Sequence, residues 1–497
     1  MIHRGIHSIH EKLKQGRRTV SAKTHDAPIK KKIDLEALRP DDMSWPDFLV
    51  MLLQIGAELE HALMVQYLYA AYSLGGERVA SEHREQVQQW QSSILTVARE
   101  EMGHLLTIQN LLTLLGGALN FGREDYPWDS PFYPAPFCLE PVTLDSLACY
   151  IFAEAPEHVP DTSTAYRRYN RTDKAKIIEC VRKRMPRGKV AHHVDEIYEA
   201  ILELVKDTDR IPDRCFIADS IGRQMSWHEF GKSYGPQDPP AVTEEKKAEM
   251  HAAKQPWQWE ARVILPRMAT RTEAIAALED VAGQGESPHI GDNYAEPSHF
   301  DRFLEVYQGL RDLQGRNGRR TVHITRPVVV NPSTRPSRAK HATYLSNDQT
   351  RCWAQLANAR FRMLLAYLSH MYRLVPDAAE PGARPGMLHR IFGEMYNIKA
   401  LASLLGRMPA HHDPALGVAG VPFEIPYTLT LPDRERDRWT VHLDLYTEML
   451  SLNEELVKMG PAPDGLAYLD TLRALDEQSM RWIEQQLRAT EGGRITV

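Results

Sequence analysis

The sequence predicts a mainly α-helical protein built on a four-helix bundle with long insertions and followed by a helical C-terminal half. Two long stretches support this fold class, ELEHALMVQYLYAAYSL at residues 58–74 and ILTVAREEMGHLLTIQNLL at residues 94–112. Each has apolar residues at helical spacing, and the connection between them is short, which favours an antiparallel helix pair. Helical spacing returns later in the chain and dominates its last part.

Acidic and histidine side chains lie on the apolar faces of these two helices. Glu101 and His104 are three residues apart and share a face with Val97 and Leu105, since such residues are neighbours on a helix. Glu60 lies on the apolar stripe of the other helix. A lone buried carboxylate tends to take up a proton, whereas a bound cation allows several carboxylates to stay charged. A Glu from one helix and Glu-x-x-His from the next are half the ligand set of a di-iron or di-manganese bundle.

Local signals set the expected element boundaries. The first helix is expected from about Pro46 to Leu74, with Ser44 or Asp47 as its cap and Gly75-Gly76 at its end. The second should run from about Glu85 to Leu115 and stop at Gly116-Gly117. Residues 118–141, rich in proline and aromatics, indicate a long crossover loop. The remaining expected elements are a Thr143-capped helix to Glu154, a helix over 192–206, an irregular insertion over 208–268, a helix from Thr270 to the GQGES segment, a helix beginning near Pro297, an extended RRTVHITRPVVVNP segment and C-terminal helices between about 345 and 490.

The four bundle helices are therefore expected within residues 46–74, 85–115, 143–206 and 296–313. We expect the chain to divide into a basic, flexible arm over residues 1–33, a metal-binding bundle with insertions over 34–320, and a helical region over 321–497 that packs on the bundle.

Composition narrows the class of protein. The chain has 497 residues, 43% of them hydrophobic, and a formal net charge of −6, which argues against nucleic acid as the main partner. We found no apolar run approaching the roughly 20 residues of a membrane span, so no membrane role is expected. Five cysteines without a C-x-x-C pair fit neither a disulfide framework nor a zinc ribbon, and they favour the cytoplasm.

Several segments, in order, resemble one known family. They are ELEHALMVQYLYAAYSL, REEMGHLLTIQNLLTLLGG, FAEAPE, DEIYEAI, GQGES and SHFDRF. They look like the ferritin-like domain of the iminophenyl-pyruvate dimer synthase family, whose violacein- and rebeccamycin-pathway members couple two amino-acid-derived imines. The resemblance covers about residues 40–310, and the AGVPFE segment extends it to about residue 427.

The resemblance implies a set of metal ligands. Glu60, Glu101 and His104 match the first half of a ferritin-like dimetal site, and Glu296 with His299 matches a second Glu-x-x-His. The third-helix carboxylate is either Glu154 or Glu196, which the sequence favours equally. Pro297 places Glu296 at the start of its helix, where capping competes with metal binding. Val65 and Gln66 stand where family members usually carry a proline pair, which implies a straighter first helix.

The expected function is a metal-dependent oxidoreductase, similar to an iminophenyl-pyruvate dimer synthase. It would use dioxygen or peroxide to oxidise or couple small amino-acid-derived molecules in a natural-product pathway. Two iron ions are the expected cofactor, with manganese, or haem through a ligand such as His299, as alternatives. Tyr67 is a core aromatic or a residue that gates electrons or hydrogen-bonds a ligand. A homodimer is the default expectation. The competing readings are a metal store or carrier and a metal-free binding scaffold.

Overall fold

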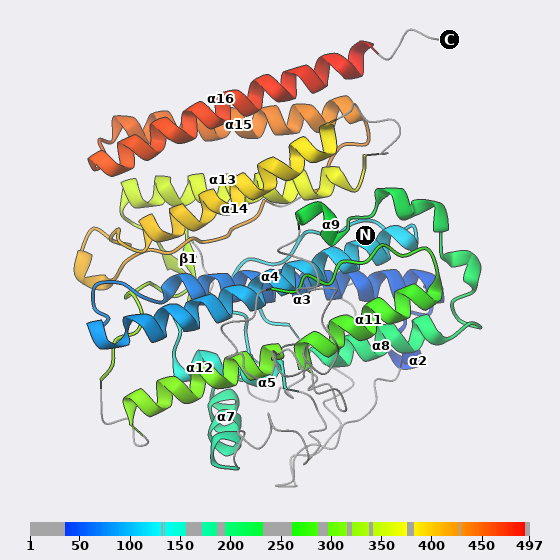
Figure 1. Ribbon diagram of the computed structural model, residues 1–497, viewed down its shortest axis with the longest axis horizontal. Coiled ribbons are helices and arrows are strands. Elements are labelled where there is room, and N and C mark those ends of the chain that lie inside the picture. Colours follow the sequence, from blue (N-terminus) through cyan, green and yellow to red (C-terminus); the bar gives the residue numbers. More distant parts are fainter. Residues whose placement is uncertain are drawn as a thin grey trace, which may run out of the picture.

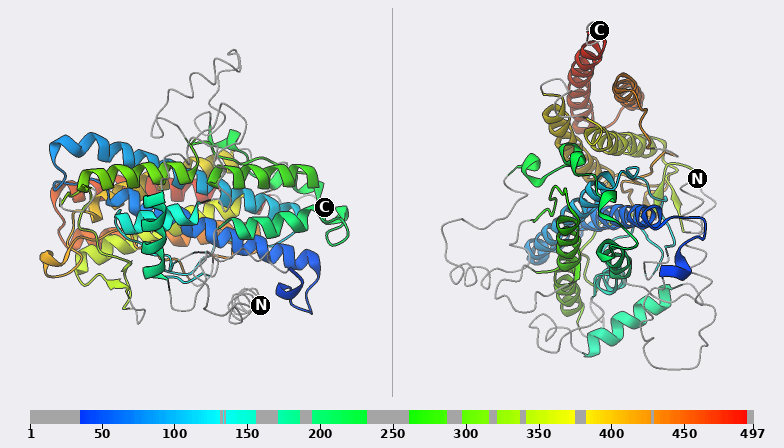
Figure 2. Two further views of the ribbon diagram at one scale, coloured as in Figure 1. Left: turned by 90° about the horizontal axis from the view of Figure 1, so that it is seen from below. Right: turned by 90° about the vertical axis from the view of Figure 1, so that its right-hand side faces the viewer.

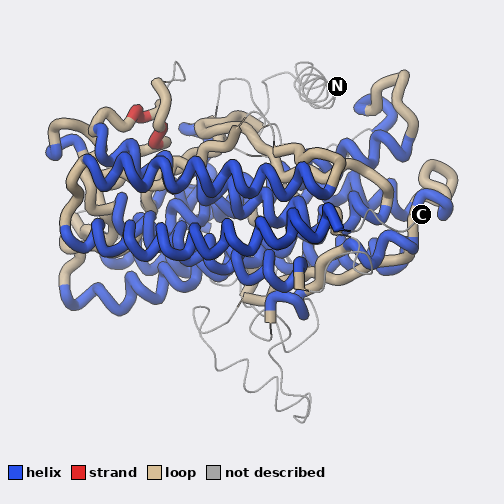
Figure 3. Tube along the Cα trace, turned by 90° about the horizontal axis from the view of Figure 1, so that it is seen from above, coloured by secondary structure: helices blue, strands red, loops and turns tan. Residues whose placement is uncertain are grey.

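Helices make up most of the described chain, and the long ones are aligned along one common axis (Figure 1). Figure 3 shows that, seen from above, these helices run the length of the molecule. The structure is a computed structural model. It describes residues 35–130, 133, 135–155, 171–185, 194–231, 261–286, 297–315, 321–336, 341–374, 382–426 and 429–492.

The helices form layers that are visible end-on in Figure 2. A central pair of long helices lies between a lower layer of shorter helices and an upper stack of C-terminal helices. The central and lower helices are α3 (Trp45–Ser73), α4 (Arg84–Leu114), α5 (Leu144–Ala153), α8 (Asp195–Lys206), α11 (Arg271–Glu286) and α12 (His299–Gln314). The upper helices are α13 (Asp348–Met371), α14 (Ala383–Leu405), α15 (Glu435–Lys458) and α16 (Pro463–Gly492).

Short elements complete the described structure. They are α2 (Leu35–Leu38), α7 (Arg171–Arg184), α9 (Trp227–Phe230), the 3-10 turns η1 (Ser81–His83), η2 (Asp213–Cys215), η3 (Ala218–Arg223) and η6 (Pro414–Leu416), and the parallel strands β1 (Pro332–Ser333) and β2 (Thr343–Tyr344). The mainly α fold class is therefore confirmed.

Local chemistry sets both ends of α3 as expected. The hydroxyl of Ser44 accepts a hydrogen bond from the backbone N–H of Asp47 at 3.2 Å, and Pro46 occupies the first turn of α3. After α3, Gly75 and Gly76 have φ of 92° and 99°, a region that glycine enters at little cost. The predicted bounds of both central helices agree with the structure to within one residue.

The other two bundle helices are each made of two segments placed end to end. The backbone N–H of Val194, at the start of α8, lies 3.5 Å from the carbonyl oxygen of Ala153, at the end of α5. Helices α5 and α8 thus follow one helical path that is interrupted between Ala153 and Val194. Figures 1 and 2 show α11 and α12 in line in the same way. We refer to these interruptions as the two helix breaks.

Two expectations about this layer were incomplete. The fourth bundle helix was expected over residues 296–313 alone, but α11 supplies its other half and packs against α8. The GQGES segment was also expected to interrupt the helix, yet α11 continues through Gly285 to Glu286. Tertiary packing against the bundle outweighs the low helix propensity of glycine here.

The described parts of the insertion after α8, residues 208–231 and 261–268, contain only two 3-10 turns and one four-residue helix, as expected, and pack along α4. The side chain of Asn110 bonds both backbone groups of Met225, donating to its carbonyl oxygen and accepting from its N–H, each at 2.9 Å. The hydroxyl of Thr107 donates to the carbonyl oxygen of Ile264 at 2.6 Å. These contacts hold the extended segment 261–268 against the middle of the bundle.

The upper stack is connected to the bundle through the AGVPFE segment. The guanidinium of Arg123, in the crossover loop, donates to the carbonyl oxygen of Phe423. The buried carboxylate of Glu424 accepts hydrogen bonds from Ser333, Thr334 and Asn358. Because these donors come from separate segments, Glu424 joins the extended connector to α13.

Helix α3 also has the length and composition of a membrane span, contrary to the expectation that no run approaches it. Its most apolar 18-residue window has a mean hydropathy of 1.6, and 94% of that window is buried within the structure. Core helices pass the same test, so this helix alone is weak evidence for a membrane span.

A buried acid on α3 leads to a prediction about stability and pH. Glu58 faces Asn120, whose amide donates to it at 3.2 Å, and burial raises its pKa from 4.5 to about 7. The pKa of Glu58 is higher in the folded state than in the unfolded chain, so the folded state favours the protonated, neutral side chain. The contribution of this neutral side chain to the free energy of unfolding is complete below pH 4.5 and is lost as pH rises through 7. We expect Glu58→Gln to be more stable than wild type at pH 8, by roughly 3 kcal/mol, and nearly equal to it at pH 4.5.

Urea unfolding of both proteins at the two pH values measures this difference. Glu77→Gln serves as the control, because Glu77 is exposed and is not among the groups that act on Glu58. The same stability difference at both pH values would contradict the role given to burial.

Candidate metal centre

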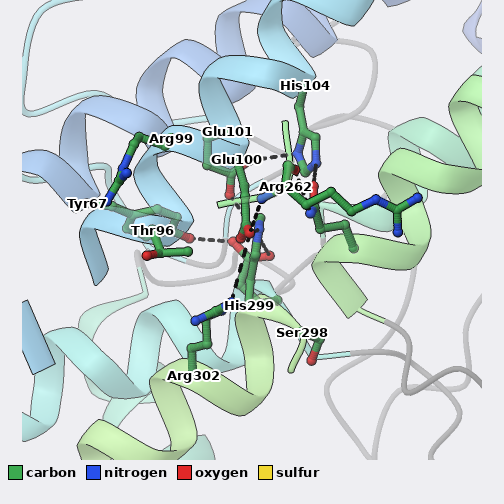
Figure 4. Close-up of polar contacts among 12 residues, drawn as sticks. Tyr67, Thr96, Arg99, Glu100, Glu101, His104, Arg262, Ser298, His299 and Arg302 are labelled. Atoms are coloured by element: carbon green, nitrogen blue, oxygen red, sulfur yellow. Dashed lines mark hydrogen bonds and ion pairs between the residues drawn. The ribbon is translucent and has the colours of Figure 1, made fainter. Parts of the chain in front are cut away.

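Five of the seven predicted ligands meet at the helix breaks, halfway along the central pair. Glu60 comes from the middle of α3, and Glu101 and His104 come from the middle of α4. Glu154 is the residue that ends α5, and His299 is the first residue of α12. All five residues are at least 96% buried. Figure 4 shows Glu101 and His104 pointing from α4 toward His299.

Two groups of three side chains present ligand atoms within 4.8 Å of one another. Position A consists of Glu60, Glu101 and His104. Position B consists of Glu101, Glu154 and His299. Because Glu101 belongs to both groups, the two positions are adjacent and share one carboxylate.

Distances in position A converge on one ring nitrogen. Nδ1 of His104 lies 2.9 Å from Oε2 of Glu101 and 3.4 Å from Oε2 of Glu60. The other nitrogen, Nε2, lies 3.0 Å from the amide oxygen of Gln284 on α11. The Gln284 amide nitrogen donates to the carbonyl oxygen of Arg262 at 2.9 Å, which orients the amide. Its oxygen therefore accepts the proton of Nε2, so that Nδ1 would be the electron-pair donor to a metal ion once it has lost its own proton.

Position B has the same arrangement. Nδ1 of His299 lies 3.1 Å from Oε1 of Glu101 and 3.5 Å from Oε2 of Glu154. Its Nε2 lies 3.2 Å from Oε2 of Glu100. The two imidazole rings stack with centroids 5.5 Å apart. Both rings thus direct Nδ1 to the centre and Nε2 to a backing side chain.

The atoms that face the centre suit a metal ion. Among the buried atoms without a hydrogen-bond partner are Oε2 of Glu60, Oε1 of Glu101 and Nδ1 of His299. Such atoms are expensive to bury unless something pairs with them. Carboxylate oxygens and imidazole nitrogens are donors that iron and manganese accept. The donor set and the unpaired atoms therefore fit a pair of metal ions.

Two tyrosines each hold one oxygen of a terminal carboxylate. The hydroxyl of Tyr67, on α3, donates to Oε1 of Glu154 at 2.5 Å. The hydroxyl of Tyr198, on α8, donates to Oε1 of Glu60. Each glutamate is left with Oε2 directed to the centre, which favours ligation through a single oxygen. The Tyr67 ring also packs against Phe303 at 4.7 Å between centroids, so the residue is both a core aromatic and a partner of a predicted ligand.

The pKa values reflect dense charge in a buried place. Burial, then repulsion by Glu101, raises the pKa of Glu60 to about 8. Burial also raises the pKa of Glu101, but the attraction of His299 and His104 is larger than the effect of burial, so the pKa of Glu101 is lowered overall. Burial is likewise outweighed at His104, where Glu101 and Glu60 raise the pKa to about 10. Imidazolium protons thus balance the carboxylates, and a metal ion would replace them with release of protons.

Two other predicted ligands stand apart from this group. Glu196 is buried on α8 but belongs to neither position, so the structure brings Glu154 and not Glu196 to the centre. Glu296 lies outside the described residues. Whether any of these side chains binds metal stays a prediction.

Sequence reasoning missed three residues around the centre, Tyr198, Glu100 and Gln284. Each lies in a segment that had been singled out: DEIYEAI, REEMGH and GQGES. Nothing in the type or spacing of these residues marks them out within those segments, because the ligands that they contact are contributed by other helices for Tyr198 and Gln284 and, for Glu100, by α12. Only the fold reveals those contacts.

Comparison with known proteins agrees with this geometry. A family model described as Ferritin-like matches residues 53–308. The chain is similar to dichlorochromopyrrolate synthase of Lentzea aerocolonigenes, with 32% identity over 130 residues, 22% of this chain and 13% of that protein. It is also similar to 2-imino-3-(indol-3-yl)propanoate dimerase of Chromobacterium violaceum, with 30% identity over 135 residues and the same shares of each chain.

These curated relatives are matched over only about an eighth of their own length. No solved structure matches the chain.

Proposed function

Because this chain belongs to the ferritin-like family, we propose that it is a metal-dependent oxidase of a biosynthetic pathway. The observation that carries the proposal is the pair of adjacent buried positions sharing Glu101. Two iron or manganese ions held there would supply activation of dioxygen or peroxide. The names of the two relatives, a synthase and a dimerase of an imino acid, support a small amino-acid-derived substrate.

An oxidative coupling is the specific reaction that we propose. Joining two imino acids through a new carbon–carbon bond removes two electrons and two protons. If hydrogen peroxide is the oxidant, it takes up the two electrons and two protons and yields two molecules of water. If dioxygen is the oxidant, it takes up the same electrons and protons and yields hydrogen peroxide. The protein residues would orient the ligands through Tyr67, Tyr198, Glu100 and Gln284. The surrounding burial would keep bulk water away from the reacting groups.

Metal analysis and oxygen uptake together test this function. Protein freed of metal and reconstituted anaerobically with Fe²⁺ should bind about two ions per chain. It should then consume dioxygen or peroxide only when an aromatic α-imino acid, generated in place from the amino acid, is supplied. Bound metal without substrate-dependent consumption would favour a store or carrier. A protein without metal after reconstitution would favour a binding scaffold.

A further inference from the structure

The two metal positions have matched ligands but unlike surroundings. Each position has two carboxylates and one imidazole, and each imidazole directs Nε2 to a side chain behind it. Behind His104 this side chain is the neutral amide of Gln284. Behind His299 it is the carboxylate of Glu100. The two positions thus differ in the charge of the side chain behind the imidazole, which is neutral at position A and negative at position B.

The surroundings of Glu100 keep its carboxylate negatively charged. Its Oε1 accepts a hydrogen bond from the backbone N–H of Arg262 at 3.2 Å. The guanidinium of Arg302 lies 4.0 Å from the same oxygen. The other oxygen of Glu100, Oε2, faces His299.

The peptide groups of Arg262 fix the positions of both backing residues. The Arg262 N–H bonds Glu100 and the Arg262 carbonyl oxygen bonds the Gln284 amide. Arg262 lies in the extended segment held along α4 by Thr107 and Asn110. The difference between the two positions is therefore built into the packing of the insertion on the bundle.

A negative charge behind a ligating imidazole makes it a stronger donor. The carboxylate attracts the Nε2 proton and so raises electron density at Nδ1, and losing such a partner typically weakens metal binding 10–100-fold. The His299–Glu100 contact has ion-pair distance without hydrogen-bond alignment, so its effect is electrostatic. Oε2 of Glu100 lies 3.2 Å from the His299 imidazole, whereas Oε1 of Glu100 lies 4.0 Å from the Arg302 guanidinium. The carboxylate therefore acts on the imidazole from a shorter distance than Arg302 acts on the carboxylate.

We propose that Glu100 makes position B the tighter of the two metal positions, so that it is filled before position A. This inference rests on the metal binding of the proposed function. Glu100 acts here as a positioning residue that does not itself reach the ion, and its effect is confined to the imidazole of His299.

Titration of the metal-free full-length protein with Co²⁺ tests the inference. Binding should occur in two steps, the first at least ten times tighter than the second, with the cobalt absorption band reporting each step. Glu154→Gln should remove the tight step and Glu60→Gln the weak one, which assigns the steps to positions B and A. Glu100→Gln should weaken the tight step 10–100-fold and leave the weak step unchanged.

Reciprocal and conservative variants separate positioning from folding. Gln284→Glu places a carboxylate behind His104 and should tighten the weak step, while Glu100→Asp keeps the charge and should recover part of the affinity lost in Glu100→Gln. Circular dichroism establishes that each variant is folded. Equal affinities in the wild type, or equal effects of Glu100→Gln on both steps, would overturn the inference alone. Failure of the wild type to bind any Co²⁺, Fe²⁺ or Mn²⁺ would instead reject the proposed function.

Discussion

Replacement of Glu101 by glutamine is expected to remove both metal ions from the protein. Glu101 alone belongs to both positions, with Oε2 facing His104 at 2.9 Å and Oε1 facing His299 at 3.1 Å. Glutamine keeps the shape but loses the charge and one of the two ligating oxygens. The metal content after reconstitution, measured by mass spectrometry, should fall from about two ions per chain to well below one.

Single-position variants provide the comparison for Glu101→Gln. Glu60→Gln and Glu154→Gln should each retain about one ion, because each removes a ligand from only one position. The metal-free stability of all three variants should be measured alongside, so that loss of metal is not confused with loss of fold. Retention of one ion by Glu101→Gln would show that one of the positions is complete without the shared carboxylate.

Replacement of Arg360 by methionine is expected to give the largest loss of stability. Arg360 is fully buried where α13, α14 and α16 meet, and its guanidinium bonds Glu394 at 3.2 Å and Asp476 at 2.7 Å. Methionine fills a similar volume but leaves two buried carboxylates without a cation. Removing one partner from a buried ion pair typically costs about 3–5 kcal/mol.

Hydrogen exchange of peptides from the upper stack, read by mass spectrometry, measures this effect. Arg362 provides a matched control, because it lies on the same helix, is 36% exposed and is 3.9 Å from Glu448. Arg362→Met should change stability by less than about 1 kcal/mol. Adding Glu394→Gln and Asp476→Asn to Arg360→Met removes the uncompensated charges and should restore most of the stability. No recovery in that triple variant would mean that packing, not charge, causes the loss.

The long central helices could be predicted from sequence because their determinants are local. Ser44 caps α3 through a residue three positions away, and the glycines that end α3 act at their own positions. The same is true of Thr143, whose hydroxyl accepts from Ser146 N–H at the start of α5. For these helices, pattern and caps agree with the tertiary fold.

The composite helices could not be predicted, because their continuity is created by the fold. Glu154 and Glu196 were equally plausible third-helix ligands from the sequence. The backbone contact between Val194 and Ala153 brings the start of α8 to the end of α5, and Glu154, the C-cap of α5, lies at the centre while Glu196 on α8 does not. No local pattern records that contact across the inserted residues.

The backing residues lay beyond sequence reasoning for a similar reason. Gln284 reaches His104 from 180 residues away, and Tyr198 reaches Glu60 from 138 residues away. Their chemistry is ordinary hydrogen bonding, so nothing in residue type distinguishes them from other buried polar groups. The ligand spacing within one helix is a sequence property, whereas the support of those ligands is a property of the assembled bundle.

The placement of both helix breaks beside the ligands has a consequence for how such a protein can diversify. Glu60, Glu101 and His104 stand on uninterrupted helices, whereas Glu154 and His299 stand at helix ends beside the two helix breaks. Insertions or deletions between these helix ends would change what surrounds the candidate centre while the central pair of helices stays the same. Sequence change at the two breaks is therefore the change that the central helices tolerate best.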